Sequence, residues 1–127
     1  MNLRSNNIKN ITLCGMMGSG KSVVGKNLAS KINYVFVDVD KLIEEKLGKS
    51  ISKIFDDDGE EHFRMMEEKL TLDTLKKQKH VISLGGGAIE NFSIRNSIKE
   101  NALSIYLEVD INILTKRLAN SKNRPLI

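Results

Sequence analysis

The residues between Gly15 and Ser22 have the types and the spacing of a phosphate-binding loop. They read Gly-Met-Met-Gly-Ser-Gly-Lys-Ser and fit the pattern G-x-x-x-x-G-K-[S/T]. In such a loop, backbone N–H groups and a helix N-terminus surround an anion. We expect the Lys21 ammonium to reach the β- and γ-phosphates of a nucleotide and the Ser22 hydroxyl to bind Mg²⁺. The segment therefore predicts nucleotide binding and phosphoryl transfer, with a chance Gly-rich turn as the alternative.

The residues on either side of this loop favour the functional interpretation. Residues 11–14 are an apolar run typical of a buried strand. After the loop, Val24, Leu28 and Ile32 recur every four residues, which predicts a helix. Strand, glycine loop and helix in this order are the context that a phosphate-binding loop requires.

Two further clusters follow apolar runs that we interpret as strands. Asp38 and Asp40 follow the run at 34–37, and Gly85–Gly87 follow the run at 81–84. Since ligands of parallel sheets bind beyond the carboxyl ends of the strands, we expect both clusters beside the phosphate loop. In an extended chain both carboxylates point to one side. Asp40 is also expected to cap the next helix, so a cap plus a solvated acid is the alternative. The glycines allow a ligand close to the backbone, with a flexible turn as the alternative.

Arg64 and Ser83 add to the chemistry expected at this edge of the sheet. Arg64 lies in a helix predicted at 60–77, where a lone Arg is usually a surface residue. A guanidinium directed into the cleft would, however, bind a substrate carboxylate bidentately. Ser83 stands where many phosphate-loop enzymes carry an Asp that orients Mg²⁺, so we expect Asp38 to do part of that work.

Strands and helices alternate along the 127 residues, which predicts one α/β domain with helices on both faces of a parallel sheet. Because the chain reads Arg-Pro-Leu-Ile at 124–127 like the opening of a loop, we expect the polypeptide to continue beyond Ile127. The remaining elements expected are a helix at 50–55, a helix at 94–99 capped by Ser93, a strand at 104–107 and a helix capped by Asp110.

Composition limits the partners and the compartment. The formal net charge is +4, and basic and acidic residues are interspersed, so we expect small anions as ligands and no nucleic acid. No apolar stretch is long enough to predict a transmembrane helix. The first ten residues are polar and Cys14 is the single cysteine, from which we expect a cytoplasmic protein without a secretory signal.

Five segments occur in an order and at a spacing that together are specific. They are the loop Gly15–Ser22, the pair Asp38 and Asp40, Gly59-Glu60-x-x-Phe63-Arg64-x-x-Glu67, Ser83-Leu84-Gly85-Gly86-Gly87-Ala88, and Arg124-Pro125-Leu126. On these segments, over nearly its whole length, the chain resembles the shikimate kinase family.

The resemblance implies a three-layer α/β P-loop fold, similar to nucleoside monophosphate kinases, with a central parallel sheet. Residues 1–127 would form a single P-loop kinase domain, truncated at the lid, with most of the lid and the final strand and helix beyond Ile127. The implied reaction transfers the γ-phosphoryl group of ATP to the 3-hydroxyl of shikimate, giving shikimate 3-phosphate and ADP in chorismate and aromatic amino-acid biosynthesis. ATP and Mg²⁺ would be the cofactors, shikimate the partner, and the protein a monomer.

The resemblance also implies roles for individual residues. Lys21, Asp38 and Asp40 would be catalytic: Asp40 would hold the acceptor hydroxyl and could accept its proton, while Asp38 would contact Mg²⁺ through water. Arg64 would clamp the shikimate carboxylate, with Gly86 and Gly87 as backbone contacts. Arg117 would lie against adenine, and Arg124 would be a lid arginine at the phosphates. The full set of expected ATP contacts is Gly15, Gly18, Ser19, Gly20, Lys21, Ser22, Val23, Arg117 and Arg124.

The chain departs from the family pattern at two points, and two alternative functions remain open. Val39 stands where the family often has Thr or Ser, and the second arginine for the substrate carboxylate would lie beyond Ile127. The chain could instead be another small-metabolite kinase of this fold, such as a gluconate kinase, or a non-catalytic nucleotide-binding module. ATP turnover with and without shikimate would separate these hypotheses.

Overall fold

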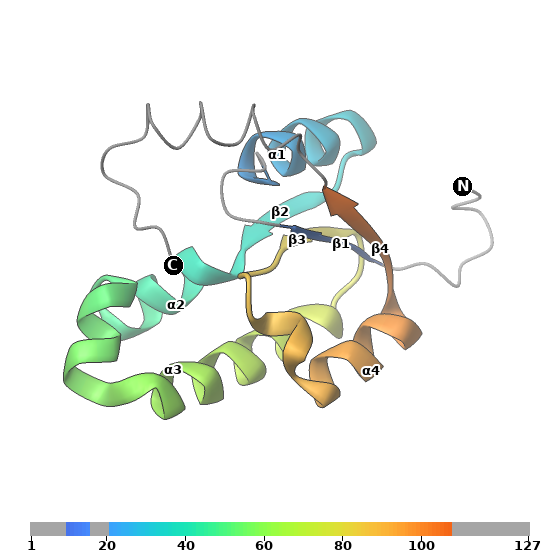
Figure 1. Cartoon of the computed structure of the whole chain (residues 1–127). Helices are drawn as coiled ribbons and strands as arrows, with labels where there is room; N and C mark the ends of the chain where they lie inside the picture. The colour runs from blue at the N-terminus through green and yellow to red at the C-terminus, as the bar shows by residue number, and fades with distance from the viewer. Residues whose placement is uncertain (1–9, 16–20, 108–127) are drawn as a thin grey trace, which may run out of the picture.

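A parallel β-sheet lies at the centre of this computed structural model, which describes residues 10–15 and 21–107 (Figure 1). Within these residues the strand order is β2-β3-β1-β4, and every neighbouring pair is parallel. The strands are β1 (Asn10–Gly15), β2 (Val35–Asp38), β3 (His80–Ser83) and β4 (Ala102–Leu107). All four strands expected from the sequence are therefore confirmed, with ends that shift by one or two residues.

Helices cover both faces of the sheet, which confirms the predicted α/β class. α1 packs on one face, and α2, α3 and α4 pack on the other (Figure 1). The helix expected after Asp110 lies outside the described residues. The helical elements are α1 (Lys21–Ile32), α2 (Val39–Leu47), α3 (Ile51–Leu75), the short 3-10 helix η2 (Ala88–Glu90) and α4 (Phe92–Asn101).

Each face of the sheet has its own apolar core. Ile11 and Val81 belong to the core under α1, together with Ala29 of that helix. Ile82, the next residue of β3, belongs to the other core, with Ile94 of α4. Successive strand residues point to opposite faces, so a strand covered on both sides is apolar at most of its positions. This is why the strands appear in the sequence as continuous apolar runs.

The fully buried Asn10 side chain connects the end of α3 to the sheet. Its Nδ2 donates to the carbonyl oxygens of Leu75 (3.0 Å) and Lys77 (2.9 Å), and its Oδ1 accepts from the His80 N–H (3.0 Å). All three partners lie where α3 turns into β3. A buried amide can remain there because its polar atoms are satisfied.

The first turns of α2 and α4 differ from the expectation. Asp38, not Asp40, caps α2: its Oδ1 accepts from the Lys41 N–H at 3.3 Å, and the helix begins at Val39. Likewise Asn91, not Ser93, caps α4. At the start of each helix, two residues that favour the N-cap position stand two positions apart. For α2, the complete burial of Val39 against the core favours the earlier start. From the sequence, Asp40 was expected in an extended chain. That expectation is wrong, because Asp40 lies in the first turn of α2.

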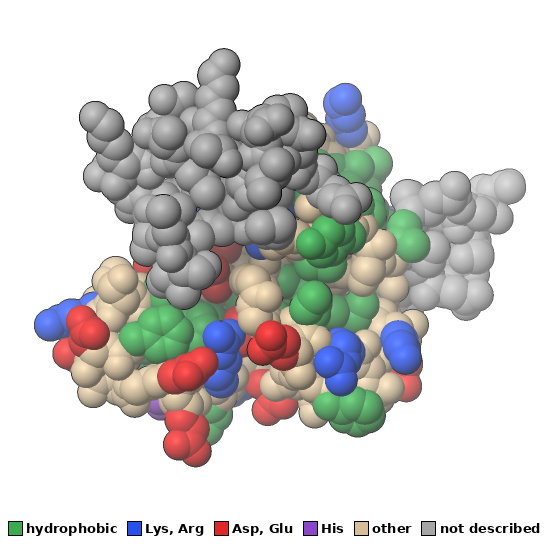
Figure 2. Space-filling view, viewed as in Figure 1, with side chains coloured by type: hydrophobic (Ala, Val, Ile, Leu, Met, Phe, Trp, Pro, Cys, Tyr) green, Lys and Arg blue, Asp and Glu red, His purple; other side chains and the backbone are tan. Residues whose placement is uncertain are grey.

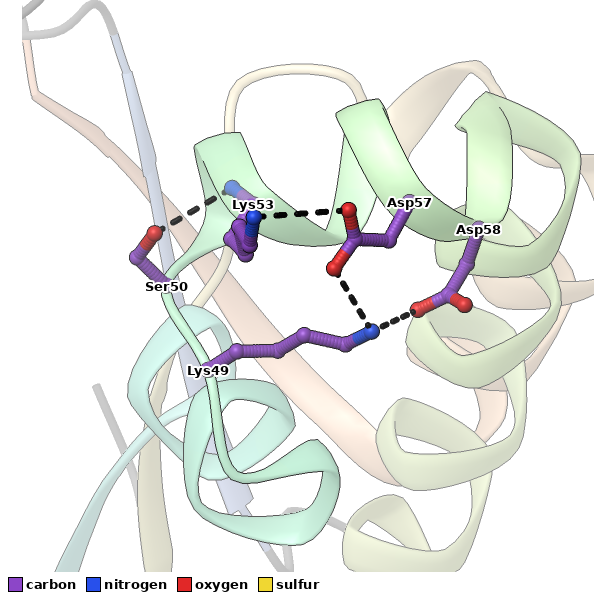
Figure 3. A network of polar contacts seen from close by, with 5 residues as sticks. All are labelled: Lys49, Ser50, Lys53, Asp57 and Asp58. Atoms are coloured by element: carbon purple, nitrogen blue, oxygen red, sulfur yellow. Dashed lines mark hydrogen bonds and ion pairs between the residues drawn. The ribbon is translucent and has the colours of Figure 1, made fainter.

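A network of ion pairs encloses the turn between α2 and α3 (Figure 3). Lys49 Nζ lies 3.3 Å from Asp57 Oδ2 and 2.8 Å from Asp58 Oδ2, while Lys53 Nζ lies 3.6 Å from Asp57 Oδ1. The Ser50 hydroxyl caps α3 by accepting from the Lys53 N–H at 3.2 Å. These contacts connect the turn to the two residues that precede a break in α3 at Gly59.

The break at Gly59 separates the two helices expected at 50–55 and 60–77. Its backbone has φ 87° and ψ 162°, a conformation essentially restricted to glycine. A Cβ at this position would meet nothing within 4 Å, so only the backbone conformation demands glycine.

Gly59→Ala should therefore lower the free energy of unfolding by about 1–3 kcal/mol through backbone strain. Urea unfolding followed by circular dichroism would measure the change. Gly86→Ala is the matched control, because Gly86 also has open space around it and is not among the described glycines with positive φ. Equal stability of Gly59→Ala and the unmodified protein would contradict the strain argument.

The described surface carries mixed charges. On the face shown in Figure 2, acidic and basic side chains are interspersed over the helices, with apolar side chains between them. Among the described residues, no helix is long and apolar enough to cross a membrane.

Candidate active site

Lys21 lies at the carboxyl ends of the two central strands. It is the first residue of α1, and its Nζ donates to the carbonyl oxygens of Gly15 (3.2 Å) and Leu84 (2.9 Å). Gly15 ends β1 and Leu84 follows β3, so the ammonium lies where a phosphate-binding loop needs a cation. The predicted contacts Gly18, Ser19 and Gly20 lie outside the described residues.

Ser22 and Asp38 form the pair expected to contact Mg²⁺. Ser22 Oγ donates to Asp38 Oδ2 at 3.2 Å, and both residues border a cavity of about 260 Å³. Asp38 ends β2 directly beside Ser83 of β3, so its carboxylate comes from the strand next to the one that many phosphate-loop enzymes use. A hydroxyl and a carboxylate are oxygen donors of the kind that Mg²⁺ prefers, and the pair fits that ion.

The Asp40 carboxylate lies against the backbone of Gly85. A Cβ at Gly85 would stand 2.8 Å from Asp40 Oδ1, so glycine leaves the space that the carboxylate occupies. Burial, followed by the nearby charges of Asp38 and Glu67, raises the pKa of Asp40 from 3.8 to about 6, although Lys21 acts in the opposite direction. Asp40 is therefore a carboxyl group that changes charge just below neutral pH.

Arg64 lies against the third residue of the glycine run. A Cβ at Gly87 would stand 2.7 Å from Arg64 Nη1 and 2.8 Å from Nη2, so this position too must lack a side chain. Arg64 Nη1 donates to Glu67 Oε1 at 3.0 Å, and Nε donates to Glu60 Oε2 at 3.4 Å. The Arg64 side chain is 40% exposed, which leaves the guanidinium open to a ligand. This favours the interpretation as a ligand clamp over that of an ordinary surface residue.

Glu67 belongs to this cluster, although no role was predicted for it from the sequence. It is 2% exposed, and its Oε2 is a buried atom without a hydrogen-bond partner in the part of the chain that the structure describes. Its spacing of three residues from Arg64 on a helix was a signal that could have revealed the pair. Since Glu67 orients the guanidinium and acts on the pKa of Asp40, it influences both ends of the glycine run.

The structure says less about the other residues that were expected to contact shikimate or ATP. Gly86 is exposed, with open space where a Cβ would stand, so a ligand can reach its backbone. Val23 is 66% exposed on α1, and its expected contact with ATP stays a prediction. Arg117 and Arg124 lie outside the described residues.

The site has two ends that meet at the edge of the sheet. Lys21, Ser22 and Asp38 could hold a phosphate chain with its metal ion, while Asp40, with Arg64 across the glycine run, could hold a hydroxyl and a carboxylate. Asp40 joins the two ends, because the charges of both Lys21 and Glu67 act on its pKa. The arrangement can therefore bring an acceptor hydroxyl to a bound phosphate.

Comparisons with known proteins agree with this chemistry. The family model for shikimate kinase matches residues 17–127. A shikimate kinase from Sulfurihydrogenibium sp. is 47% identical over 120 residues, which is 94% of this chain and 72% of that protein. A solved shikimate kinase from Acinetobacter baumannii, in complex with shikimate, matches with a TM-score of 0.85 at 34% identity, over 98% of this chain and 70% of that one. The chain belongs to the shikimate kinase family. The predicted family and its P-loop fold are thereby confirmed.

Two further comparisons limit what membership in the shikimate kinase family implies. A gluconokinase from Sinorhizobium meliloti matches with a TM-score of 0.58 at 19% identity, over 93% of this chain and 67% of that one. That likeness concerns the fold alone. The chain spans only part of its curated relatives: 72% of the shikimate kinase from Sulfurihydrogenibium sp. and 56% of that from Bartonella quintana.

Proposed function

We propose that this protein transfers the γ-phosphoryl group of ATP to the 3-hydroxyl of shikimate, giving shikimate 3-phosphate and ADP. The shikimate oxygen would form the new bond to the γ-phosphorus, while the bond to the β–γ bridging oxygen breaks and ADP leaves with that oxygen. The product would serve the biosynthesis of chorismate and aromatic amino acids.

The observation that carries this proposal is the pair of contacts on the glycine run. Arg64 lies against Gly87, and Asp40 lies against Gly85 two residues earlier. A small acceptor with a carboxylate at one end and a hydroxyl at the other could bind Arg64 and Asp40 at once. The open backbone of Gly86 lies between these two positions. A carboxylate paired with a guanidinium gives a bidentate, charge-assisted contact that also orients the acceptor.

At the nucleotide end, Lys21 would bind the β- and γ-phosphates, and Ser22 and Asp38 would hold Mg²⁺, Asp38 through water. When bound, Mg²⁺ neutralises negative charge on the phosphates. The chain's own contribution is position and charge, which are the main requirements of phosphoryl transfer. Asp40 would orient the acceptor hydroxyl and accept its proton late in the reaction, since a loose transition state leaves that proton in place.

The remaining expectations are also proposals. The contacts of Gly18, Ser19, Gly20 and Val23 with ATP, of Arg117 with adenine and of Arg124 with the phosphates would complete the site. Residues 1–127 would belong to a single kinase domain, in a cytoplasmic monomer that binds no nucleic acid. Light scattering on the purified protein would test the oligomeric state.

Two other functions would use the same nucleotide site. A gluconate kinase-like enzyme also needs a cation for a carboxylate, and a non-catalytic module would need only nucleotide binding. Production of ADP by the complete protein, measured with shikimate, with gluconate and with neither, separates the three. We expect turnover with shikimate alone, whereas turnover with gluconate, or binding of ATP without turnover, would support an alternative.

Arg64→Ala should weaken shikimate binding by roughly ten- to a hundredfold and leave ATP binding nearly unchanged, because it removes a charge-assisted contact. Arg64→Lys should restore only part of the loss, since an ammonium lacks the planar fork. Calorimetric titration of each ligand would measure both affinities. Lys69→Ala, an exposed cation on α3, is the matched control. If both ligands weaken equally, or neither does, Arg64 is not the clamp.

A further inference from the structure

The segment between β3 and α4 carries the glycines of the site and ends at Asn91. Its backbone is folded on itself by three successive bonds: Ala88 N–H to Gly85 O (3.2 Å), Glu90 N–H to Gly87 O (3.2 Å) and Asn91 N–H to Ala88 O (3.1 Å). Since these three turns overlap along the chain, a displacement of Asn91 is transmitted toward Gly87.

Asn91 holds the end of this segment between two helices. Its Oδ1 accepts from the Ile94 N–H at 3.0 Å and so caps α4. Its Nδ2 donates to Glu68 Oε1 at 3.0 Å, across to α3. The two helices pack together on the same face of the sheet (Figure 1). One side chain therefore connects the glycine segment both to the helix it enters and to the helix beside it.

α3 is also the helix that carries the carboxylate clamp. Glu68 lies four residues, about one turn, after Arg64. A Cβ at Gly87 would stand 2.7 Å from Arg64 Nη1, so the guanidinium lies close against the Gly87 backbone. A displacement of the glycine backbone relative to α3 changes the space in which a carboxylate must fit, and errors near 1 Å are costly at such sites.

We propose that Asn91 and Glu68 are positioning residues for carboxylate recognition, whose hydrogen bond fixes the glycine backbone at its distance from the Arg64 guanidinium. The inference rests on the proposed function and deepens it, because it says what holds the two halves of the acceptor site together. The proposed role of both residues is to position the site, without direct contact to the substrate.

Steady-state kinetics of the complete protein test the contact from both sides. Glu68→Ala removes the acceptor and leaves the α4 cap intact, and Asn91→Ser keeps a capping hydroxyl that is too short to reach α3. Each variant should raise the KM for shikimate by about two- to tenfold, the value of one hydrogen bond, with kcat and the KM for ATP nearly unchanged. Glu100→Gln, which removes an exposed carboxylate from α4, controls for the change in charge.

Exchanging donor and acceptor gives the decisive variant. Asn91→Asp alone places two carboxylates together and should raise the KM for shikimate further. In Asn91→Asp/Glu68→Gln, the new amide can donate to the new carboxylate while Asp still caps α4, and the KM should return to within about twofold of the starting value. If the two residues only stabilised the fold, the melting temperature would fall and the KM would not follow the exchange.

The outcomes separate this inference from the proposed function. An unchanged KM for shikimate in both Glu68→Ala and Asn91→Ser, or no rescue by the exchange, would overturn the positioning role while leaving the proposed function intact. A protein that does not phosphorylate shikimate before any substitution would overturn the proposed function itself.

Discussion

Asp40→Asn should abolish phosphorylation of shikimate and at the same time make the folded protein more stable at neutral pH. The activity is lost because an amide can neither accept the proton of the hydroxyl nor orient it as a carboxylate does. The stability is gained because the native environment opposes the charge: burial, Asp38 and Glu67 raise the pKa of Asp40 from 3.8 to about 6. Asn has nearly the same shape and no charge.

The sign of the pH dependence follows from this upward shift. Between pH 4 and pH 6 the folded protein holds the Asp40 proton more tightly than the unfolded chain does, so stability from this group falls as the pH rises through that range. Above pH 6 Asp40 is charged in the folded protein, and its ionisation lowers the free energy of unfolding by the full amount. The pKa shift from 3.8 to about 6 corresponds to roughly 3 kcal/mol as an upper value. Asp40→Asn should remove this cost.

Urea unfolding at pH 5 and pH 7.5, together with an ADP assay, would measure both effects. The difference in stability between Asp40→Asn and the unmodified protein should be larger at pH 7.5 than at pH 5. Asp73→Asn, an exposed carboxylate on α3, should leave both stability and activity near their starting values. Lower stability of Asp40→Asn at pH 7.5 would contradict the electrostatic argument.

Asp38→Asn distinguishes the two carboxylates. Asp38 accepts from the Ser22 hydroxyl, so its loss of charge should raise the Mg²⁺ concentration needed for half-maximal activity. Asp40→Asn should leave Mg²⁺-ATP binding largely intact. If Asp40→Asn shifts the Mg²⁺ requirement and Asp38→Asn does not, the two roles are reversed.

The sheet could be predicted from the sequence because its central strands, β1 and β3, are largely buried on both faces, and its edge strands, β2 and β4, are still mostly apolar. Such strands appear as short apolar runs with turn residues at their ends, because few solvent-facing polar residues interrupt them. Gly48 is a similar local signal, since glycine commonly follows the last turn of a helix; it ends α2 with φ 70°, and its N–H donates to Glu44 O at 2.8 Å. Local signals of this kind depend on one residue and its neighbours.

Helix starts were predicted less well because two caps competed. Both Asp38 and Asp40 can cap a helix, and local preference does not separate them. The packing of Val39 decides, and that depends on contacts with distant parts of the chain. The error mattered for the site, because it left Asp40 in an extended chain when its carboxylate in fact projects from the first turn of α2 toward Gly85.

The residues that orient the site were the hardest to find. Glu67 is a buried carboxylate that acts by accepting a hydrogen bond from Arg64. Asn91 donates to Glu68, which lies 23 positions earlier in the sequence. A single sequence contains no signal for the second contact, because hydrogen bonds between helices depend on tertiary structure. Residue types and spacing therefore predicted which residues could carry chemistry, but not the contacts between helices that hold them in place.

Lys21→Ala should lower kcat about a hundredfold or more, through lost electrostatic stabilisation of the charge that develops as ADP leaves. Lys21 Nζ lies between the ends of β1 and β3, 3.2 Å from Gly15 O and 2.9 Å from Leu84 O, where the phosphates are expected to bind. Lys31→Ala, an exposed cation in the last turn of α1, is the matched control for charge and should retain activity.

The same substitution should also change the pH profile, which a simple loss of folded protein would not do. The charge of Lys21 lowers the pKa of Asp40, against burial and the nearby acids that raise it. Without the ammonium, the pKa of Asp40 should rise further, and the acidic limb of the residual activity should move to higher pH. Single-turnover rates across a pH series, at saturating Mg²⁺-ATP and shikimate, would measure this. A hundredfold slower enzyme with an unmoved acidic limb would mean that Lys21 acts on the phosphates without influencing Asp40, and near-normal turnover would mean that it acts on neither.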